Sequence, residues 1–359
     1  MSDQPTVVVA MSGGVDSSVA ATLLVHQGYR VIGMMMRLWS EPGKEADNRC
    51  CTPDAIAMAR RVAAILNIPF YTIDAQAEFH SRVVEYFING YIHGVTPNPC
   101  LMCNRHIRWE FLLNHALSLG AQFMATGHYA QVRKTEDGLF QLVKAISPQK
   151  DQSYILHVMN QESLSHALFP VGTYEKKEVR ELAAQYNLPV ADRGESQDLC
   201  FLGNSDYRDF LARYAPHSYQ PGSIRTSDGR LLGQHQGLSS YTIGQRKGLG
   251  IQSPEPLYVI AKDALTNALI VGTSKEMGKS TFLAKDVNWI SGSPPKEELR
   301  AQIKIRYKAA EAWGWVKPVG EDAFQVKLDE PLRDITPGQA AVIYDGDVCL
   351  GGGIIDVEA

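Results

Sequence analysis

The sequence predicts an α/β protein whose first domain is a parallel sheet and whose last domain is a small antiparallel β-barrel. Over the first third of the chain, short apolar runs alternate with longer amphipathic stretches, which is typical of βαβ units. Beyond Phe282, apolar and polar residues alternate one by one, which is typical of strands with one buried face. Between these regions glycine and proline are frequent, and neither pattern can be followed.

The pattern of the first region defines its elements in order. Strands that are joined by helices lie parallel in a Rossmann-like sheet, and such sheets bind ligands at the carboxyl ends of their strands, where the strand order reverses. The sequence therefore predicts a ligand crevice at that edge. We expect strands over 7–10, 31–36, 70–73 and 123–126, and helices over 17–27, 53–67, 78–91 and 107–119.

The last region has apolar residues at every second position from Leu299 to Tyr307 and again from Phe324 to Leu328. Several such strands between glycine and proline turns favour a closed antiparallel barrel. The texture of the sequence also changes near Gly203, where the strand–helix alternation ends. We therefore expect three domains, which cover residues 1–203, 204–279 and 280–359.

The composition is that of an ordinary globular protein. The chain has 359 residues, 45% hydrophobic and 21% charged, which is enough apolar material for several cores. Neither a signal-peptide pattern nor a membrane-length apolar segment is present, so we expect a cytoplasmic monomer without a membrane partner. The net charge of −4 excludes a broad, histone-like affinity for nucleic acid, although it allows a local basic face.

The strongest local signal is the run Ser12-Gly13-Gly14-Val15-Asp16-Ser17-Ser18, which lies between a strand and a helix. Glycines let the backbone approach phosphates, the helix start offers N–H groups and partial positive charge, and the serines add hydroxyl donors. The run lacks the lysine of a Walker A loop. The alternative is a tight turn in which Asp16 is an ordinary helix-start residue. We expect the loop to bind a polyphosphate.

Two further pieces follow strands of the predicted sheet. Met36 ends the second strand, and Gly127 and His128 follow the fourth, so all of them face the same crevice as the glycine loop. An apolar methionine and a glycine without a side chain suit the adenine and ribose of a nucleotide. The alternatives are a core methionine and a structural histidine.

Six cysteines are too few for a disulfide scaffold in a chain of this length. Cys100 and Cys103 form a Cys-x-x-Cys pair in a proline-rich turn just before a helix, where a thiol is acidified and becomes a better nucleophile. Cys200 lies 97 positions beyond Cys103 (200 − 103). Sulfur transfer needs one thiol to carry a persulfide and another to resolve it, which two separated cysteines provide. For the adjacent Cys50 and Cys51 we expect a loop role, and for Cys349 a place in the core.

The glycine loop resembles that of the PP-loop ATP pyrophosphatases, which cut ATP between its α and β phosphates and leave an adenylated intermediate. The whole ordered set of motifs resembles the tRNA-uridine 2-sulfurtransferases, also called tRNA-specific 2-thiouridylases, over nearly the full length. The resemblance is carried by residues 12–18, 98–104, 125–129, 150–154, 168–172, 237–238, 244–250, 336–339 and 349–353.

The resemblance implies adenylation of the C2 oxygen of the wobble uridine by ATP and Mg²⁺, followed by sulfur transfer. Cys200 would carry the persulfide sulfur, and Cys103 would attack it or resolve the resulting bond, while a separate donor protein reloads the thiol. No resident metal site is implied, and Asp16 would help position the magnesium that accompanies ATP. The implied ATP-binding residues are Ala10, Met11, Ser12, Gly13, Gly14, Val15, Asp16, Ser17, Met36 and Gly127.

The same resemblance implies contacts with the tRNA anticodon arm. In the barrel, Arg300, Lys304 and Arg306 alternate on one face of a strand; the pattern alone favours a solvated surface, and the resemblance favours a phosphate-binding one. Chemistry on a base requires that the base leave the stack. Asn98, Pro99 and Cys100 would line this flipped base, and His128, Lys150, Asp151, Gln152, Arg306, Tyr307 and Gln339 would contact the tRNA.

The sequence departs from some relatives at Cys100, where they carry an aspartate proposed as an acid–base group; that role does not transfer to a thiol. Cys100, Cys103 and Cys200 are also compatible with three-ligand binding of an iron–sulfur cluster, although we favour the persulfide route without a cluster. Two other functions stay open. One is a PP-loop ligase or amidotransferase, and the other is a tRNA-binding nucleotide sensor without catalysis.

Overall fold

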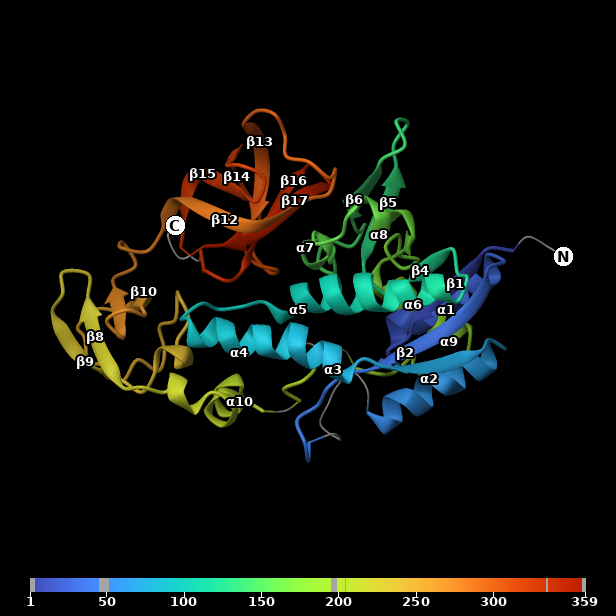
Figure 1. Cartoon of the computed structure of the whole chain (residues 1–359), viewed down its shortest axis with the longest axis horizontal. Coiled ribbons are helices and arrows are strands. Elements are labelled where there is room, and N and C mark those ends of the chain that lie inside the picture. The colour runs from blue at the N-terminus through green and yellow to red at the C-terminus, as the bar shows by residue number, and fades with distance from the viewer. Residues whose placement is uncertain (1–3, 45–51, 195–198, 204, 334, 357–359) are drawn as a thin grey trace.

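The computed structural model describes residues 4–44, 52–194, 199–203, 205–333 and 335–356. Cys50 and Cys51 therefore lie outside the described residues. Three bodies follow one another along the chain (Figure 1): a sheet with helices in blue to green, a small yellow body, and an orange-to-red barrel beside the first body. Among the described residues, no helix is both long and apolar enough to cross a membrane.

The first body contains a five-stranded parallel sheet in the order β3-β2-β1-β4-β7. The four predicted strands are confirmed within one or two residues at each end. The sequence missed β7, because two residues give no readable pattern. The order reverses between β1 and β4, which is the point where such sheets bind ligands. The strands are β1 (Thr6–Ala10), β2 (Arg30–Arg37), β3 (Phe70–Asp74), β4 (Phe123–Ala125) and β7 (Ala167–Leu168).

Both faces of this sheet are covered, so β1 is buried on both sides. Val7 and Val9 pack into one apolar cluster together with Val19, while Val8 packs on the opposite face with Trp109. Successive side chains of a strand point to opposite faces, which explains the split. The helices on the Val7 face are α1 (Val15–His26), α2 (Pro53–Ile65) and α9 (Lys176–Gln185).

Two longer helical stretches pass through π-helical turns, and they run beside each other across the middle of the view in Figure 1. The second begins at Pro99, eight residues before the predicted start at Ile107 (107 − 99), because Asn98 caps it and proline is favoured in the first turn. The prediction that the Cys-x-x-Cys pair precedes this helix is therefore wrong. The stretches are α3 (Gln76–Phe79), η2 (His80–Val84), α4 (Glu85–Ile92), and α5 (Pro99–Met102), η3 (Cys103–Leu112), α6 (Leu113–Ser118).

The central body is a four-stranded sheet in the order β10-β11-β8-β9, with a small apolar core of its own that includes Ile224, Val259 and Leu269. A helix and two short 3₁₀ turns connect this body to the first. Its elements are α10 (Tyr207–Tyr214), η4 (Pro216–Ser218), β8 (Gly222–Thr226), β9 (Leu231–His235), η5 (Leu238–Ser240), β10 (Tyr258–Asp263) and β11 (Ala268–Gly272).

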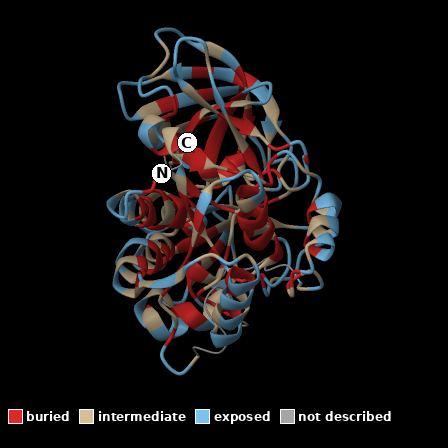
Figure 2. Cartoon of the chain, turned by 90° about the vertical axis from the view of Figure 1, so that its right-hand side faces the viewer, coloured by how far each residue is buried: buried red, intermediate tan, exposed pale blue. Residues whose placement is uncertain are grey.

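The last body is the predicted antiparallel barrel, which the β12–β17 pairing closes. Ile303, Val316 and Phe324 fill its interior, and the buried residues gather there in Figure 2. The hairpin β5–β6 of the first body extends the same sheet, because β6 pairs with β17. The strands are β12 (Lys279–Trp289), β13 (Leu299–Lys304), β14 (Ala312–Pro318), β15 (Ala323–Leu332), β16 (Ala340–Asp345), β17 (Val348–Ile355), β5 (Ala130–Lys134) and β6 (Phe140–Lys144).

Candidate active site

The glycine loop between β1 and α1 is shaped by close packing. Gly13 has a φ of +71°, and a Cβ there would meet the Ala55 carbonyl group of α2, with the Ala55 Cα at 3.0 Å. Only glycine fits such a position without strain. Gly14 caps α1 without a side-chain hydrogen bond, and the Ser18 hydroxyl donates to its carbonyl at 2.8 Å. The positive end of α1 therefore points into the crevice.

Gly127 lies against the other side of this loop. A Cβ at Gly127 would fall 2.6 Å from the Ser17 amide nitrogen and 2.7 Å from the Asp16 carbonyl carbon. The end of β4 is thus pressed onto the first turn of α1. Met36, at the end of β2, packs against two apolar clusters. The fold brings these predicted nucleotide residues to the edge where the strand order reverses.

The remaining predicted nucleotide residues contribute mainly through their backbone. Met11 and Val15 are buried in the apolar cluster under α1, and Ala10 is half-buried on the opposite face of the sheet. The Ser12 and Ser17 hydroxyl oxygens lie 3.1 Å apart. These two hydroxyls are the side-chain groups that the loop offers beside its amides.

Asp16 is already held by two side chains from distant segments. Its Oδ1 accepts hydrogen bonds from Lys176 Nζ at 2.6 Å and from the Tyr129 hydroxyl at 2.8 Å. The Lys176 side chain is only 14% exposed. Sequence reasoning missed Lys176, because the contact spans 160 residues and the lysine lies in an ordinary polar helix start. A cation therefore stands beside the phosphate loop even though the loop has no Walker lysine.

Arg193 is a second cation beside the loop, and no pattern in the sequence indicated it. Its guanidinium donates to the Gly13 carbonyl at 3.2 Å and forms an ion pair with Asp54 at 2.9 Å. The chain thus brings two positive side chains, from segments 160 and 180 residues away, to the glycine loop. Positive charge beside backbone amides is what polyphosphate binding requires.

The described residues contain no group of three or more His, Cys, Asp and Glu side chains placed to hold a metal ion. Mg²⁺ is commonly held by one or two carboxylates together with substrate phosphates, and Asp16 fits that limited role. Cys100, Cys103 and Cys200 do not form such a group either. Among the residues that the structure describes, these three thiols therefore do not form an assembled site for an iron–sulfur cluster.

The Cys-x-x-Cys pair occupies the first turns of the helical stretch α5–η3. The Asn98 side chain accepts a hydrogen bond from the Cys100 amide at 3.2 Å, and Asn104 donates to the Cys100 carbonyl at 2.9 Å. Cys100 is exposed, whereas Cys103 is only 6% exposed. The two thiols therefore face different environments, although they are one turn apart.

Arg108 connects Cys103 with the end of β4. Its Nη1 lies 3.3 Å from Cys103 Sγ and 3.4 Å from Asn104 Oδ1. The Arg108 charge also reaches His128, whose Nδ1 lies 2.7 Å from the Thr126 hydroxyl. Burial, and then the charge of Arg108, lower the pKa of His128 to about 3. His128 is consequently a neutral hydrogen-bonding group at physiological pH.

Cys103 and Cys200 share one apolar cluster, which we call the thiol cluster. Cys103 is one of its buried members, and Cys200 packs against it. Phe201 anchors the second cysteine, because its ring lies 5.3 Å from that of Phe87 and 5.6 Å from that of Phe210. Folding therefore brings the two thiols to one region of the molecule. The buried members of the cluster include Phe79, Phe87, Cys103, Ile107, Phe201 and Phe210.

The predicted tRNA residues after β6 form a tightly bonded turn. The buried Asp151 carboxylate accepts from the Ala145 amide at 3.0 Å and from the Ser153 hydroxyl at 2.7 Å. Gln152 exchanges two hydrogen bonds with the Tyr129 backbone, at 2.9 and 2.8 Å. Lys150 is half-buried beside them. Asp151 and Gln152 thus shape this turn, which leads into the short helices α7 (Ser153–Leu156) and α8 (Gln161–Ser165).

A barrel loop is hydrogen-bonded to the segment just before the helix that carries Cys100 and Cys103. Gln339 donates to the Thr96 carbonyl at 2.8 Å, and the Thr96 amide donates to the Pro337 carbonyl at 2.9 Å. A Cβ at Gly338 would lie 2.9 Å from the Thr96 backbone. The predicted residue Gln339 therefore lies close to the predicted base-lining residues, which begin at Asn98. This closeness joins two motifs 241 residues apart (339 − 98).

Two other predicted barrel residues are turned toward the protein. Arg306 donates to the Thr336 hydroxyl and to the Ile243 carbonyl, the latter at 3.4 Å. The Tyr307 ring centroid lies 6.2 Å from that of Tyr154. Arg306 thus connects the barrel with the central body, and Tyr307 packs on the first body.

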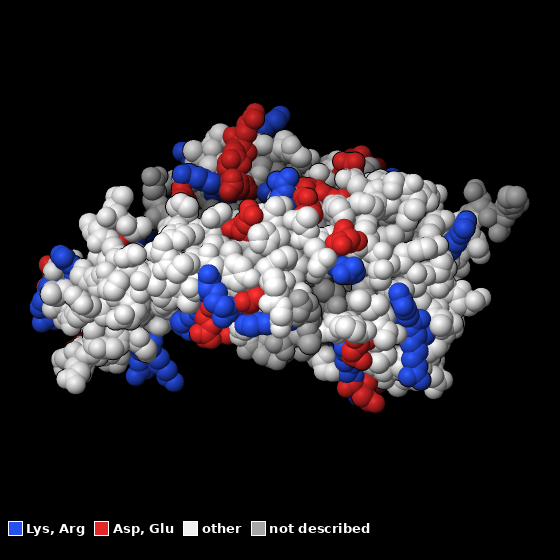
Figure 3. Space-filling model, turned by 60° about the horizontal axis from the view of Figure 1, so that its bottom comes forward, with Lys and Arg blue, Asp and Glu red and all other residues white. Residues whose placement is uncertain are grey.

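The predicted row of cations begins on the outer face of β13, where Arg300 is exposed and Lys304 is half-buried. Arg300 forms an ion pair with Asp329 and lies over the Trp313 and Trp315 rings, at 5.3 and 5.7 Å from their centroids. Arg306 lies two residues beyond the end of β13, although buried and half-buried positions still alternate through Ile305 and Arg306. On the face shown in Figure 3, charged side chains stand in separate groups between wide uncharged areas.

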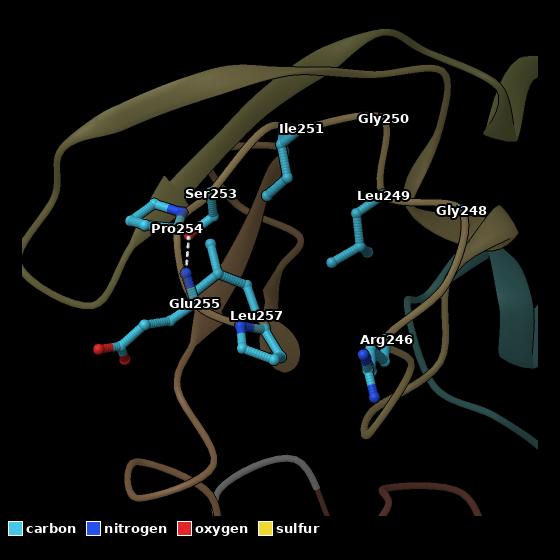
Figure 4. Close-up of a pocket in the computed structure, with 10 residues that line it drawn as sticks. Arg246, Gly248, Leu249, Gly250, Ile251, Ser253, Pro254, Glu255 and Leu257 are labelled. Atoms are coloured by element: carbon cyan, nitrogen blue, oxygen red, sulfur yellow. Dashed lines mark hydrogen bonds between the residues drawn. The ribbon is translucent and has the colours of Figure 1, made fainter.

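The central body carries a separate hollow of about 380 Å³. Figure 4 shows Arg246 and Leu249 on one wall and Pro254 and Glu255 on the other. The hollow includes part of the predicted motif at 244–250. None of the predicted nucleotide or sulfur residues lines it, so we place the chemistry at the glycine loop and the thiol cluster.

Comparison with known proteins identifies the family of this chain. Residues 5–204 match the family described as tRNA methyl transferase HUP domain, residues 208–273 the tRNA methyl transferase PRC-barrel domain, and residues 279–355 the aminomethyltransferase beta-barrel domain. A tRNA-specific 2-thiouridylase MnmA of Chloroflexus aurantiacus is 47% identical over 350 residues, which cover 97% of this chain and 98% of the relative. The chain belongs to the tRNA-specific 2-thiouridylase family.

Other thiouridylases match over a similar extent. The MnmA protein of Clostridioides difficile is 43% identical over 352 residues, which cover 98% of both chains. A solved 4-thiouridine synthetase–RNA complex with bound ATP is a distant likeness, with 15% identity, a TM-score of 0.39, and coverage of 59% of this chain and 50% of that one. These matches confirm the predicted resemblance to the thiouridylases and the predicted fold class. They also identify the middle domain as a PRC-barrel domain.

Proposed function

We propose that this chain uses ATP to activate the C2 oxygen of the wobble uridine of certain tRNAs, and then replaces that oxygen with sulfur from a cysteine persulfide. The observation that carries the proposal is the joint packing of Cys103 and Cys200 in the thiol cluster. Arg108 donates to Cys103 Sγ, and its charge also acts on His128, which follows the same strand end as Gly127. Sulfur chemistry and nucleotide chemistry thereby share one crevice.

In the first step, adenylate passes from ATP to the C2 oxygen, and pyrophosphate is released. A poor leaving oxygen thereby becomes part of a good leaving group, AMP. The amides at the start of α1 bind the polyphosphate, and Lys176 and Arg193 add positive charge beside the same loop. Asp16 would be the protein carboxylate that holds Mg²⁺ at the loop, and the ion would supply positive charge to the phosphates. We assign this step to residues 1–203.

In the second step, the terminal sulfur of a Cys200 persulfide attacks C2, and AMP departs with the former uridine oxygen. The base is then joined to Cys200 through a disulfide. The Cys103 thiolate attacks Sγ of Cys200, which forms a Cys103–Cys200 disulfide and releases 2-thiouridine. A thiol reductant opens that disulfide, and a separate persulfide-carrying protein reloads Cys200.

The uridine must leave the anticodon stack to reach this chemistry. We assign the flipped base to Asn98, Pro99 and Cys100, because this helix start carries an exposed thiol beside the buried Cys103. His128 contributes a neutral hydrogen-bonding ring, since burial keeps its pKa near 3. We assign no proton-transfer role to Cys100.

The rest of the tRNA anticodon arm is gripped from two sides in this proposal. The turn of Lys150, Asp151 and Gln152 approaches it from residues 1–203. Arg306, Tyr307 and Gln339 approach it from the barrel domain, residues 280–359, with residues 204–279 as a central domain between them. Asp151, Gln152 and Gln339 act by shaping their loops, because their side chains are bonded within the protein.

The test is thiolation of unmodified tRNA by the purified full-length chain, with ATP, Mg²⁺ and a persulfide donor, and with 2-thiouridine measured by mass spectrometry of nucleosides. We expect Cys103→Ser and Cys200→Ser each to abolish product. The matched control is Cys349→Ala, which removes a buried barrel thiol outside the thiol cluster and keeps activity. Full activity of either serine variant would contradict the proposed sulfur route.

The same assay separates the other candidate functions. A ligase or amidotransferase would consume ATP and modify its substrate without either thiol. A nucleotide sensor would bind tRNA but release no pyrophosphate in its presence. An enzyme that needs an iron–sulfur cluster would contain iron in proportion to its activity, whereas the persulfide route predicts activity in iron-free protein. We also propose that the chain acts as a cytoplasmic monomer, which sedimentation of the active enzyme and cell fractionation test.

A further inference from the structure

The contact between Arg108 and Cys103 depends on an unusual helix. In an α-helix, residues three and four apart are neighbours, and a residue five positions on points to a different side. The η3 segment, Cys103–Leu112, is π-helical, and its wider turn closes i→i+5 hydrogen bonds. Arg108 therefore reaches back five residues to Cys103 Sγ at 3.3 Å, and four residues to Asn104 Oδ1 at 3.4 Å.

We propose that Arg108 is a positioning residue that holds Cys103 as a thiolate, and that the π-helical turn exists to bring its guanidinium onto the sulfur. The significance of this pairing for catalysis rests on the proposed function, in which Cys103 resolves the bond to Cys200. The thiolate itself can be tested without tRNA or ATP. The two ideas can therefore fail separately.

Burial alone would make Cys103 a poor nucleophile, because an apolar environment disfavours the charged thiolate. The helix start gives little compensation, because Cys103 lies beyond the first turn, where the effect of the helix dipole fades. The Cys100 amide is also already bonded to Asn98. Arg108 supplies the compensation instead, since its guanidinium stays protonated at any physiological pH.

A histidine is the usual cation beside a reactive cysteine. The histidine on which the Arg108 charge acts is His128, which follows β4. Its ring is buried, bonded to Thr126 and neutral. An imidazolium that titrates near neutral pH would make the thiolate depend on pH in that range. The permanent charge of Arg108 removes that dependence. The geometry therefore points to a thiolate that is already present before substrate binds.

The proposed step needs this negative charge. Cys103 Sγ forms a bond to Cys200 Sγ while the bond from Cys200 Sγ to the base-linked sulfur breaks, and the electron pair leaves on that sulfur as the thiocarbonyl forms. The protein gives no proton and uses no oxidant in this step. A thiol in place of the thiolate would first have to lose its proton inside an apolar cluster.

The experiment measures the alkylation rate of Cys103 by iodoacetamide in the full-length protein, with each cysteine peptide followed by mass spectrometry. At pH 7 we expect Cys103 to react about tenfold more slowly in Arg108→Met and Arg108→Gln than in the natural protein. The reason is that a neighbouring cation lowers the pKa of a thiol by about one unit or more. Arg108→Lys should retain much of the rate. The matched control is Arg105→Met, which removes a cation three residues away whose charge acts on Tyr86 and His157 instead.

A second pH value distinguishes charge from access. At strongly alkaline pH every thiol is ionised, so the rates of the natural protein and the Arg108 variants should converge. Equal rates at pH 7, or a tenfold gap that persists at alkaline pH, would each overturn the proposal. If neither charge-removing variant folds, the natural protein decides the matter. Its Cys103 must then titrate at lower pH in the folded state than in urea, and the opposite result refutes the idea.

The result is independent of the proposed function. Slower alkylation of the Arg108 variants in a protein that never thiolates tRNA would keep the thiolate and remove the sulfur-transfer role. Unchanged alkylation in a protein that thiolates tRNA, with activity lost in Cys103→Ser, would keep the function and remove Arg108 from it.

Discussion

Replacing Gly13 with alanine tests whether the glycine loop is shaped by its contact with α2. The change has two costs, which the structure allows to be separated. An alanine at a φ of +71° costs about 1–2 kcal/mol in backbone strain. Its Cβ would also press on the Ala55 carbonyl group, with the Ala55 Cα at 3.0 Å, and overpacking of this kind costs about 1–3 kcal/mol.

Gly28 provides the matched control, because it has a similar φ of +86° and a Cβ there would have nothing within 4 Å. Gly28→Ala therefore carries the strain without the clash. We expect Gly13→Ala to lower the free energy of unfolding of the first domain by roughly 1–3 kcal/mol more than Gly28→Ala does. We also expect only Gly13→Ala to weaken ATP binding, because a displaced loop no longer aims its amides at the phosphates.

The assays are equilibrium unfolding in urea, followed by a probe in the first domain, and titration calorimetry with ATP. Equal losses of stability in the two variants would show that α2 yields to the new methyl group. Unchanged ATP affinity in Gly13→Ala would refute the stronger conclusion that this loop binds the phosphates. The comparison uses differences between variants, so errors common to both cancel.

Two further predictions concern charge. Lys176→Met should weaken ATP binding about tenfold. The free energy of unfolding should change by only about 1 kcal/mol, because the ion pair with Asp16 is partly exposed. Unchanged ATP affinity in titration calorimetry would remove Lys176 from the site. Burial lowers the pKa of His128 to about 3 and of His157 to about 4, from 6.5. As the pH falls, the unfolded chain therefore binds protons at these histidines before the folded chain does. Their contribution to the free energy of unfolding is complete above pH 6.5, and below it is lost by up to about 1.4 kcal/mol per pH unit for each histidine. Urea unfolding of His157→Gln should show a shallower fall, and an equally steep one would contradict this.

Patterns with a regular period were readable from the sequence. The parallel strands and the barrel strands each repeat one simple alternation, and the glycine loop lies in the strand–loop–helix context that gives it meaning. The predicted start of the helix that carries the cysteines lay too far along the chain. The true start is marked by a capping residue and a proline, and not by amphipathic periodicity. Capping by Asn98 could have been read from the sequence, since asparagine followed by proline is a known helix start.

Contacts between distant segments were not readable in this way. Lys176 and Arg193 look like surface cations until the fold brings them to Asp16 and Gly13. Arg300 also has a partner that the pattern does not reveal, because Asp329 lies on β15, two strands away from β13 in the barrel sheet. The free energy of such pairs depends on geometry, which periodicity does not carry.

The barrel contacts the first domain at two places that bear on the proposed chemistry. One is the β6–β17 pairing, which makes a hairpin of the first domain part of the barrel sheet. The other is the loop around Gly338, which packs on the Thr96 backbone and directs Gln339 to the Thr96 carbonyl. Thr96 lies two residues before the cap of the cysteine helix, so a shift of the barrel moves that cap. A tRNA that contacts both bodies would therefore change the position of the helix that carries Cys100 and Cys103. We therefore propose that the barrel helps to position the helix that carries Cys100 and Cys103, in addition to contacting tRNA.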